Sequence, residues 1–170
     1  MVACGSGNSA HSGNWQNYQN ETLGISFEHP KTWIVQEIDG GIRLAIDQEA
    51  LDNDLSTGAG ATIMLATVSD FDGLVGPSDI LDLYMDYMEI GRDTLERISE
   101  PEFVTIQGQP AGIVSYRGTV KEQTGLFTLA VITNEDQIAL VLAFDGSEDE
   151  QHRETLEDIA QSISVYPPRK

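Results

Sequence analysis

Apolar and polar residues alternate along most of the chain from residue 15 onward, and glycine, proline and polar turn residues separate the alternating runs. Such alternation is typical of β-strands that bury one face. The pattern predicts strands over residues 15–20, 24–30, 34–39, 42–47, 61–69, 102–106, 111–120, 126–133 and 138–144. Residues 48–60 are polar and contain glycine, which predicts a loop.

Two turns indicate how neighbouring strands pair. Gly40 and Gly41 separate residues 34–39 from 42–47, and glycine tolerates the positive φ angles of a tight hairpin turn. The short connection from Asn134 to Gln137 makes the last two predicted strands antiparallel neighbours. Both of these strands are apolar with little alternation, so each of their faces needs a cover.

Two segments repeat apolar residues at helical spacing and are expected to supply the covers. The first spans residues 78–90, and its predicted core face carries Ile80, Leu81, Tyr84, Tyr87 and Met88. The second spans residues 148–163, where Ser147 and Glu150 are placed as a capping box and the core face carries Leu156, Ile159, Ala160 and Ile163. The predicted fold class is α/β of the α+β kind, a mainly antiparallel β-sheet flanked by helices on both faces as a three-layer α/β/α sandwich.

The segment YQNETLGISFEHPKTWIV, residues 18–35, resembles the opening of the Mog1/PsbP-like fold family. The resemblance covers residues 15–166 and rests on a short strand pair followed by a Pro-x-x-Trp turn, here Pro30 to Trp33. It implies an antiparallel sheet between helices and a non-enzymatic role in binding or assembly at another protein. Basic contacts typical of photosystem subunits are not expected here, because the lysines are only Lys31, Lys121 and Lys170. The resemblance therefore favours a bacterial lipid-anchored PsbP-like lipoprotein.

Charge narrows the classes of partner. The chain has 28 acidic and 9 basic residues, a formal net charge of −19. Nucleic-acid affinity depends on Lys and Arg neutralising phosphates, so this charge excludes nucleic acid as a partner. It favours a basic protein surface or a divalent cation, with plain solubility as the alternative explanation.

The single cysteine, Cys4, allows no internal disulfide. The run Met1-Val2-Ala3-Cys4 resembles the end of a bacterial lipoprotein signal, where a small residue precedes the acylated cysteine, although Met1 stands where an aliphatic residue is usual. This interpretation implies a longer precursor, and the alternative is an incidental cysteine near a frayed terminus. Two acyl chains on Cys4 would anchor the protein, without a transmembrane segment, to the surface of the bacterial cell envelope.

The N-terminal residues also indicate the domain organisation. Residues 5–14 are uncharged and almost free of apolar side chains, which is typical of a flexible linker. We therefore divide the chain into a lipoprotein-like tether, residues 1–14, and a single Mog1/PsbP-like domain, residues 15–170.

Five acidic residues recur at helical spacing on the polar face of the first predicted helix. They are Asp79, Asp82, Asp86, Glu89 and Asp93. Carboxylates beyond the first turn gain nothing from the helix dipole and repel one another, which makes this stripe a candidate surface for a basic partner protein. The alternative is the ordinary solvated face of an amphipathic helix.

A candidate cation site lies in the predicted loop. Asp52, Asp54 and Ser56 offer oxygen atoms at alternate positions, as loops that bind Ca²⁺ do. The spacing departs from an EF-hand, because Gly58 comes one place late and Ile63 stands where a bidentate Glu is required. An acidic surface loop is the alternative.

No motif for catalysis or a bound cofactor emerges from the sequence. His11, His29 and His152 lie far apart, without the spacing of metal ligands, and His152 is expected to be a partly buried structural residue. The leading hypothesis is a non-enzymatic, lipid-anchored extracytoplasmic module that binds or assembles another envelope protein. A small-ligand or Ca²⁺ carrier is the alternative, and an unrecognised hydrolase is the third possibility.

Overall fold

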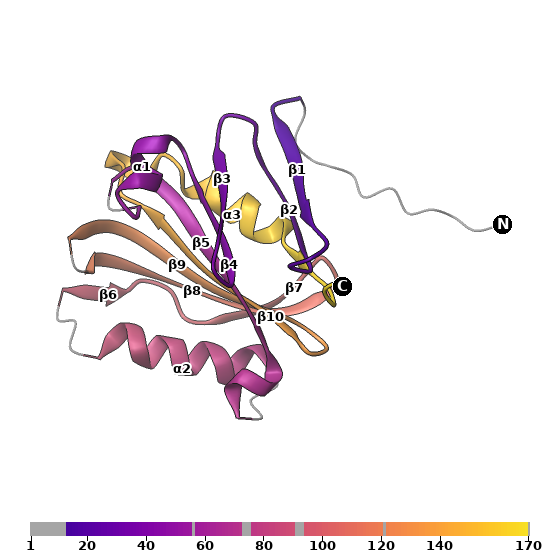
Figure 1. The fold of residues 1–170 in the computed structure, drawn as a ribbon. Helices are drawn as coiled ribbons and strands as arrows, with labels where there is room; N and C mark the ends of the chain where they lie inside the picture. Colours follow the sequence, from indigo (N-terminus) through magenta and orange to yellow (C-terminus); the bar gives the residue numbers. More distant parts are fainter. Residues whose placement is uncertain (1–12, 56, 73–75, 91–93, 121, 170) are drawn as a thin grey trace.

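Two antiparallel sheets form the frame of the protein (Figure 1). The computed structural model describes residues 13–55, 57–72, 76–90, 94–120 and 122–169. The larger sheet has the strand order β3 (Ile34–Ile38), β4 (Gly41–Ala45), β5 (Ala59–Thr67), β10 (Gln137–Asp145), β9 (Gln123–Asn134), β8 (Gln109–Val120) and β6 (Leu95–Arg97), and β7 (Glu102–Ile106) also pairs with β8. The smaller sheet has the order β1 (Trp15–Asn20), β2 (Ile25–Pro30) and β11 (Ser164–Val165).

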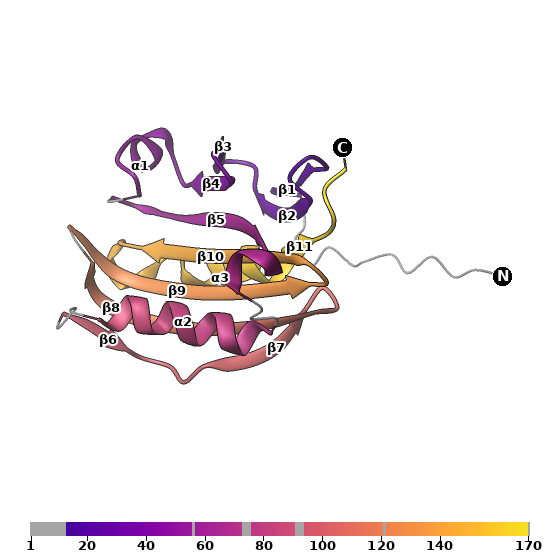
Figure 2. The same cartoon turned by 60° about the horizontal axis from the view of Figure 1, so that its bottom comes forward.

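The helices lie on both faces of the larger sheet (Figure 2). One face carries α2 (Pro77–Glu89), which packs on β8 and β9, and the short α1 (Gln48–Asp52), which contacts β4. The opposite face carries α3 (Arg153–Ser162) together with the smaller sheet. The short 3₁₀ segments η1 (Val68–Phe71) and η2 (Glu148–Glu150) follow β5 and β10. The predicted mainly antiparallel architecture with helices is thus confirmed, and the finer picture differs because a second sheet shares one layer with α3.

The nine predicted strands are all present, with ends shifted by a few residues. The short strands β6 and β11 were not predicted, because three and two residues are too few to display a period. In the first hairpin, Gly24 has φ +72°, and a Cβ there would lie 2.1 Å from the carbonyl oxygen of Tyr166. A glycine is therefore required where the C-terminal segment crosses the turn.

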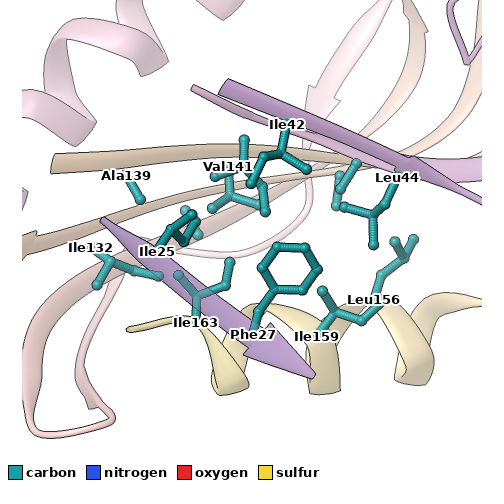
Figure 3. Packing of buried hydrophobic residues seen from close by; sticks show 14 of the residues in the cluster. Ile25, Phe27, Ile42, Leu44, Ile132, Ala139, Val141, Leu156, Ile159 and Ile163 are labelled. Carbon is teal, nitrogen blue, oxygen red and sulfur yellow. The ribbon is translucent and has the colours of Figure 1, made fainter. Parts of the chain in front are cut away.

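The first half of the core lies between the larger sheet, the smaller sheet and α3. Figure 3 shows Phe27 of β2 between the strand residues Ile42 and Leu44 and the helix residues Ile159 and Leu156. Trp33 is buried in the same cluster, and the ring of His152 lies edge-on to it at 6.1 Å between centroids. The smaller sheet therefore covers the part of the larger sheet that α3 leaves open.

The second half of the core lies beneath α2. Ile80, Leu81 and Met88 are buried as predicted, and Tyr84 is partly buried. Tyr87 was also predicted to face the core, and this was wrong: its side chain is 67% exposed, and Met85 is buried instead. Because α2 rests on β8 and β9, the side of the helix that carries Leu81 and Met85 faces the sheet.

The prediction of a continuous loop over residues 48–60 was wrong for its first part. Residues 48–52 form α1, which begins because the Asp47 carboxylate accepts a hydrogen bond from the backbone N–H of Ala50 at 2.8 Å. Leu51 and Leu55 are buried against the larger sheet. Two apolar residues in a polar segment were the signal that this segment returns to the core.

The predicted capping box of Ser147 and Glu150 was also wrong. The last helix begins later, at Arg153, and residues 148–150 form η2. The cap comes from Asp145, whose side chain is fully buried at the end of β10. Its Oδ2 accepts a hydrogen bond from the backbone N–H of His152 at 2.8 Å, and its Oδ1 accepts one from the N–H of Ser147 at 3.0 Å.

We predict that Asp145→Ala destabilises the fold by about 2–4 kcal/mol, because it leaves partly buried N–H groups without acceptors and removes a charged cap. Chemical denaturation followed by circular dichroism measures this change. The control Gln161→Ala, an exposed side chain on α3, is expected to change stability by less than about 0.5 kcal/mol. Equal effects of the two substitutions would contradict the role given to Asp145.

Candidate functional site

The candidate protein-binding surface is the outer face of α2. Asp79, Asp82 and Asp86 are exposed there, and none of them forms an ion pair with another described residue. Asp93, the last member of the predicted stripe, lies outside the described residues. The structure thus brings three carboxylates to one solvent-facing side of a single helix.

Glu89 differs from the other carboxylates of the stripe. Its Oε1 accepts a hydrogen bond from the hydroxyl of Tyr116 at 3.1 Å and lies 3.8 Å from Nε of Arg97. Tyr116 is fully buried on β8, and burial together with the bond to Glu89 raises the pKa of its hydroxyl, so that it remains a donor. Glu89 therefore fastens the C-terminal end of α2 to the sheet, a role that helical spacing alone does not reveal.

A groove runs beside the stripe, between α2 and the strands β5 and β10. We call it the α2 groove, and its volume is about 270 Å³. Tyr84, Tyr87 and Met88 line it from the helix, and Met64, Leu140 and Leu142 line it from the sheet. The sequence pattern does not reveal this groove, because helical spacing places Tyr87 on the core face and the predicted helices were expected to cover both faces of the sheet.

The candidate cation site is only partly within the described residues. Asp54 is exposed, and its Oδ1 lies 2.6 Å from Nη1 of Arg43. Oδ1 of Asp52 accepts a hydrogen bond from the side-chain amide of Gln48 at 2.7 Å, and Ser56 lies outside the described residues. Among the residues that the structure describes, no group of three or more His, Cys, Asp or Glu side chains is arranged to hold a metal. A Ca²⁺ site at Asp52, Asp54 and Ser56 stays a prediction.

The two described histidines have structural surroundings. His29 of β2 is buried, with Nδ1 2.9 Å from the carbonyl oxygen of Pro30 and Nε2 3.3 Å from the side-chain nitrogen of Gln16. Burial lowers the pKa of His29, and the hydrogen bond to Pro30 partly opposes this shift. His152 packs on Trp33, while His11 lies outside the described residues.

Residues 1–12 of the tether, which include Cys4, lie outside the described residues, so the predicted lipid attachment stays a prediction. Within the part of the chain that the structure describes, no helix is both long and apolar enough to cross a membrane.

Comparison with known proteins gives structural matches only. No family model and no curated protein sequence matches the chain. The solution structure of cyanobacterial PsbP (CyanoP) from Synechocystis sp. PCC 6803 matches with a TM-score of 0.62 and 19% identity, over 95% of this chain and 98% of that chain. A crystal structure from Bacteroides thetaiotaomicron VPI-5482 matches with a TM-score of 0.52 and 9% identity, over 89% of this chain but only 48% of that one. The chain therefore has a PsbP-like fold, which confirms the resemblance in its opening segment.

We predict that the melting temperature falls as the pH is lowered from about 7.5 to about 5.5, in part through His29. The unfolded chain binds a proton at the ordinary histidine pKa, whereas folded His29 binds it only at lower pH. The stability contributed by neutral His29 is therefore present above about pH 6.5 and lost as the pH falls through the lowered pKa.

The measurement is a set of thermal melts of the wild type and His29→Gln across this range, at constant ionic strength. His29→Gln is expected to show a shallower decline, because the amide retains hydrogen-bonding capacity without titrating. Parallel curves for the two proteins would rule out His29 as the cause.

Proposed function

We propose that the protein is a non-enzymatic binding or assembly module, held at the outer surface of a bacterial membrane by lipid on Cys4, that acts on another envelope protein. The observation that carries this proposal is the exposed carboxylate stripe, now defined as Asp79, Asp82 and Asp86 on α2. With a net charge of −19, this face attracts a partner with a basic surface and repels other acidic proteins.

The proposal assigns no catalytic step. The buried polar groups described above hold the fold together: Asp145 caps α3, Tyr116 bonds Glu89, and His29 bonds Pro30. The PsbP-like fold is compatible with this assignment by analogy. Because one fold can serve many functions, the proposal depends on the surface of α2.

The proposed tether would let the domain move away from the membrane surface while it stays attached. A glycine- and serine-rich linker of ten residues spans about 17–19 Å as a flexible coil. Lipid on Cys4 would thus keep the domain within a short distance of the membrane while it searches for its partner.

We predict that the double substitution Asp82→Lys/Asp86→Lys weakens the complex by about tenfold or more, because both charges change sign where the partner is basic. Co-purification from native membranes, repeated over a range of salt concentrations, measures the effect. The wild-type complex is expected to weaken as salt rises, since exposed charges are screened over about 10 Å at 0.1 M ionic strength.

The matched control is Glu122→Lys/Glu154→Lys. It changes the net charge by the same amount at exposed positions outside α2, in the β8–β9 turn and on α3. If this control weakens the complex as much as the α2 variant does, total charge rather than the stripe is responsible.

We further predict that Cys4→Ala moves the protein from the membrane fraction to the aqueous fraction, because the acyl chains supply the membrane affinity. Fractionation of cells that produce the full precursor, with mass spectrometry of the N-terminal peptide, measures both location and acylation. Membrane retention of Cys4→Ala without acylation of the wild type would eliminate the lipid anchor.

A further inference from the structure

The α2 groove exists because α2 covers only part of its face of the sheet. In Figure 2, α2 lies in front of β8 and β9, whereas β5 and β10 lie beside it. The other helices on this face are short: α1 has five residues and packs on β4, and the 3₁₀ helix η1 has four and follows the end of β5. An α-helix is about 10–12 Å wide and neighbouring strands are about 4.8 Å apart, so the uncovered strands offer room for one more helix.

The floor of the groove carries apolar side chains that still face solvent. Met64 of β5 is 39% exposed and Leu142 of β10 is 38% exposed, and both lie among buried residues of the same strands. Tyr87, which is exposed, adds an aromatic wall from α2. An apolar surface of this kind, bordered by polar residues, is typical of a protein interaction site.

The helix-side rim of this groove is acidic. Successive residues of an α-helix are 100° apart around its axis, so Leu83 lies next to Tyr87 on α2. Asp79 and Asp86 lie just beyond Leu83. On the opposite side the charge of Arg43 is already matched by Asp54. An occupant that packs on the floor therefore meets unmatched negative charge along the α2 rim.

The charge pattern argues against two occupants from the protein itself. A second copy would bring the same acidic rim and a net charge of −19 toward an identical surface. The tether, residues 1–14, is nearly devoid of the large apolar side chains that would fill the groove. Neither a dimer nor the protein's own tether fits the groove as well as a basic, apolar segment of another protein.

We propose that the α2 groove seats an amphipathic helix of the partner protein. Its apolar face packs on Met64, Tyr87 and Leu142, and its Lys and Arg side chains lie against Asp79 and Asp86, in a helix-in-groove mode. This inference rests on the proposed function and adds the element of the partner that is recognised.

The test uses three of the four methionines of the chain as reporters. Met64 and Met88 line the groove, whereas Met85 is buried outside it. The full chain, labelled with ¹³C at the methionine methyls, is titrated with synthetic peptides of about 14 residues, which match the length of α2 at about 20 Å. One peptide is an amphipathic helix of Leu, Ala and Lys, a second is its scrambled form, and a third replaces every Lys by Glu.

The basic amphipathic peptide is expected to shift the Met64 and Met88 signals with little effect on Met85. Leu142→Lys should weaken its binding by about tenfold or more, because a charge then lies on the apolar floor. The control Phe103→Lys makes the same change in charge at a 55% exposed apolar residue of β7, outside the groove, and should leave binding within about twofold. Thermal melts of both variants establish that they fold.

Each other outcome overturns the inference. Equal binding of the scrambled peptide would mean that charge alone attracts the partner, and equal binding of the Glu peptide would mean that the rim does not select basic segments. Dimers in sedimentation that Leu142→Lys disrupts would assign the groove to a second copy. In one outcome, no peptide binds, but Asp82→Lys/Asp86→Lys still abolishes recovery of the membrane partner. The helix-in-groove inference then fails and the proposed function stands. If the wild type also recovers no partner, the proposed function fails.

Discussion

The structure depends on one requirement: β9 and β10 are apolar on both faces, so both faces of the larger sheet must be kept from water. In β10, Ala139 and Val141 point into the cluster shared with the smaller sheet, while Ile138 and Phe144 point into the cluster beneath α2. Each buried aliphatic side chain contributes about 1.5–3 kcal/mol relative to exposure, so an uncovered face would be costly. The remaining elements are arranged around this central pair of strands.

The two faces meet this requirement differently. On one, α3 and the smaller sheet together enclose Phe27 and Ile159 almost completely. On the other, α2 covers β8 and β9, and the apolar surface continues past its edge to Met64 and Leu142. The groove is thus a direct result of an incomplete layer, and the carboxylates on α2 lie beside it because the same helix supplies both the cover and the charge.

The spacing of apolar residues and the turn residues were sufficient to predict most of the fold but less of the candidate site. Alternation and turn residues located the strands, and helical spacing located α2 with its exposed Asp82 and Asp86. The same spacing did not distinguish Tyr87 from Met85, since both flank the apolar face and only the position of β8 and β9 decides which is buried. Capping by Asp145 was missed for a similar reason, because the acceptor belongs to the preceding strand and reaches the helix through the fold.

The position of the first strand, β1, makes the two sides of the larger sheet different. β1 belongs to the layer on the α3 side of the larger sheet, whereas α2 lies on the opposite side (Figure 1). In a protein tethered through residues that precede β1, the attachment and the acidic helix are separated by the thickness of the sheet and its core. Anionic head groups would repel the carboxylates and reinforce this arrangement. Such a tethered domain would stand with α2 turned toward the aqueous compartment, where the proposed partner would be a segment projecting from a neighbouring complex rather than one lying in the bilayer.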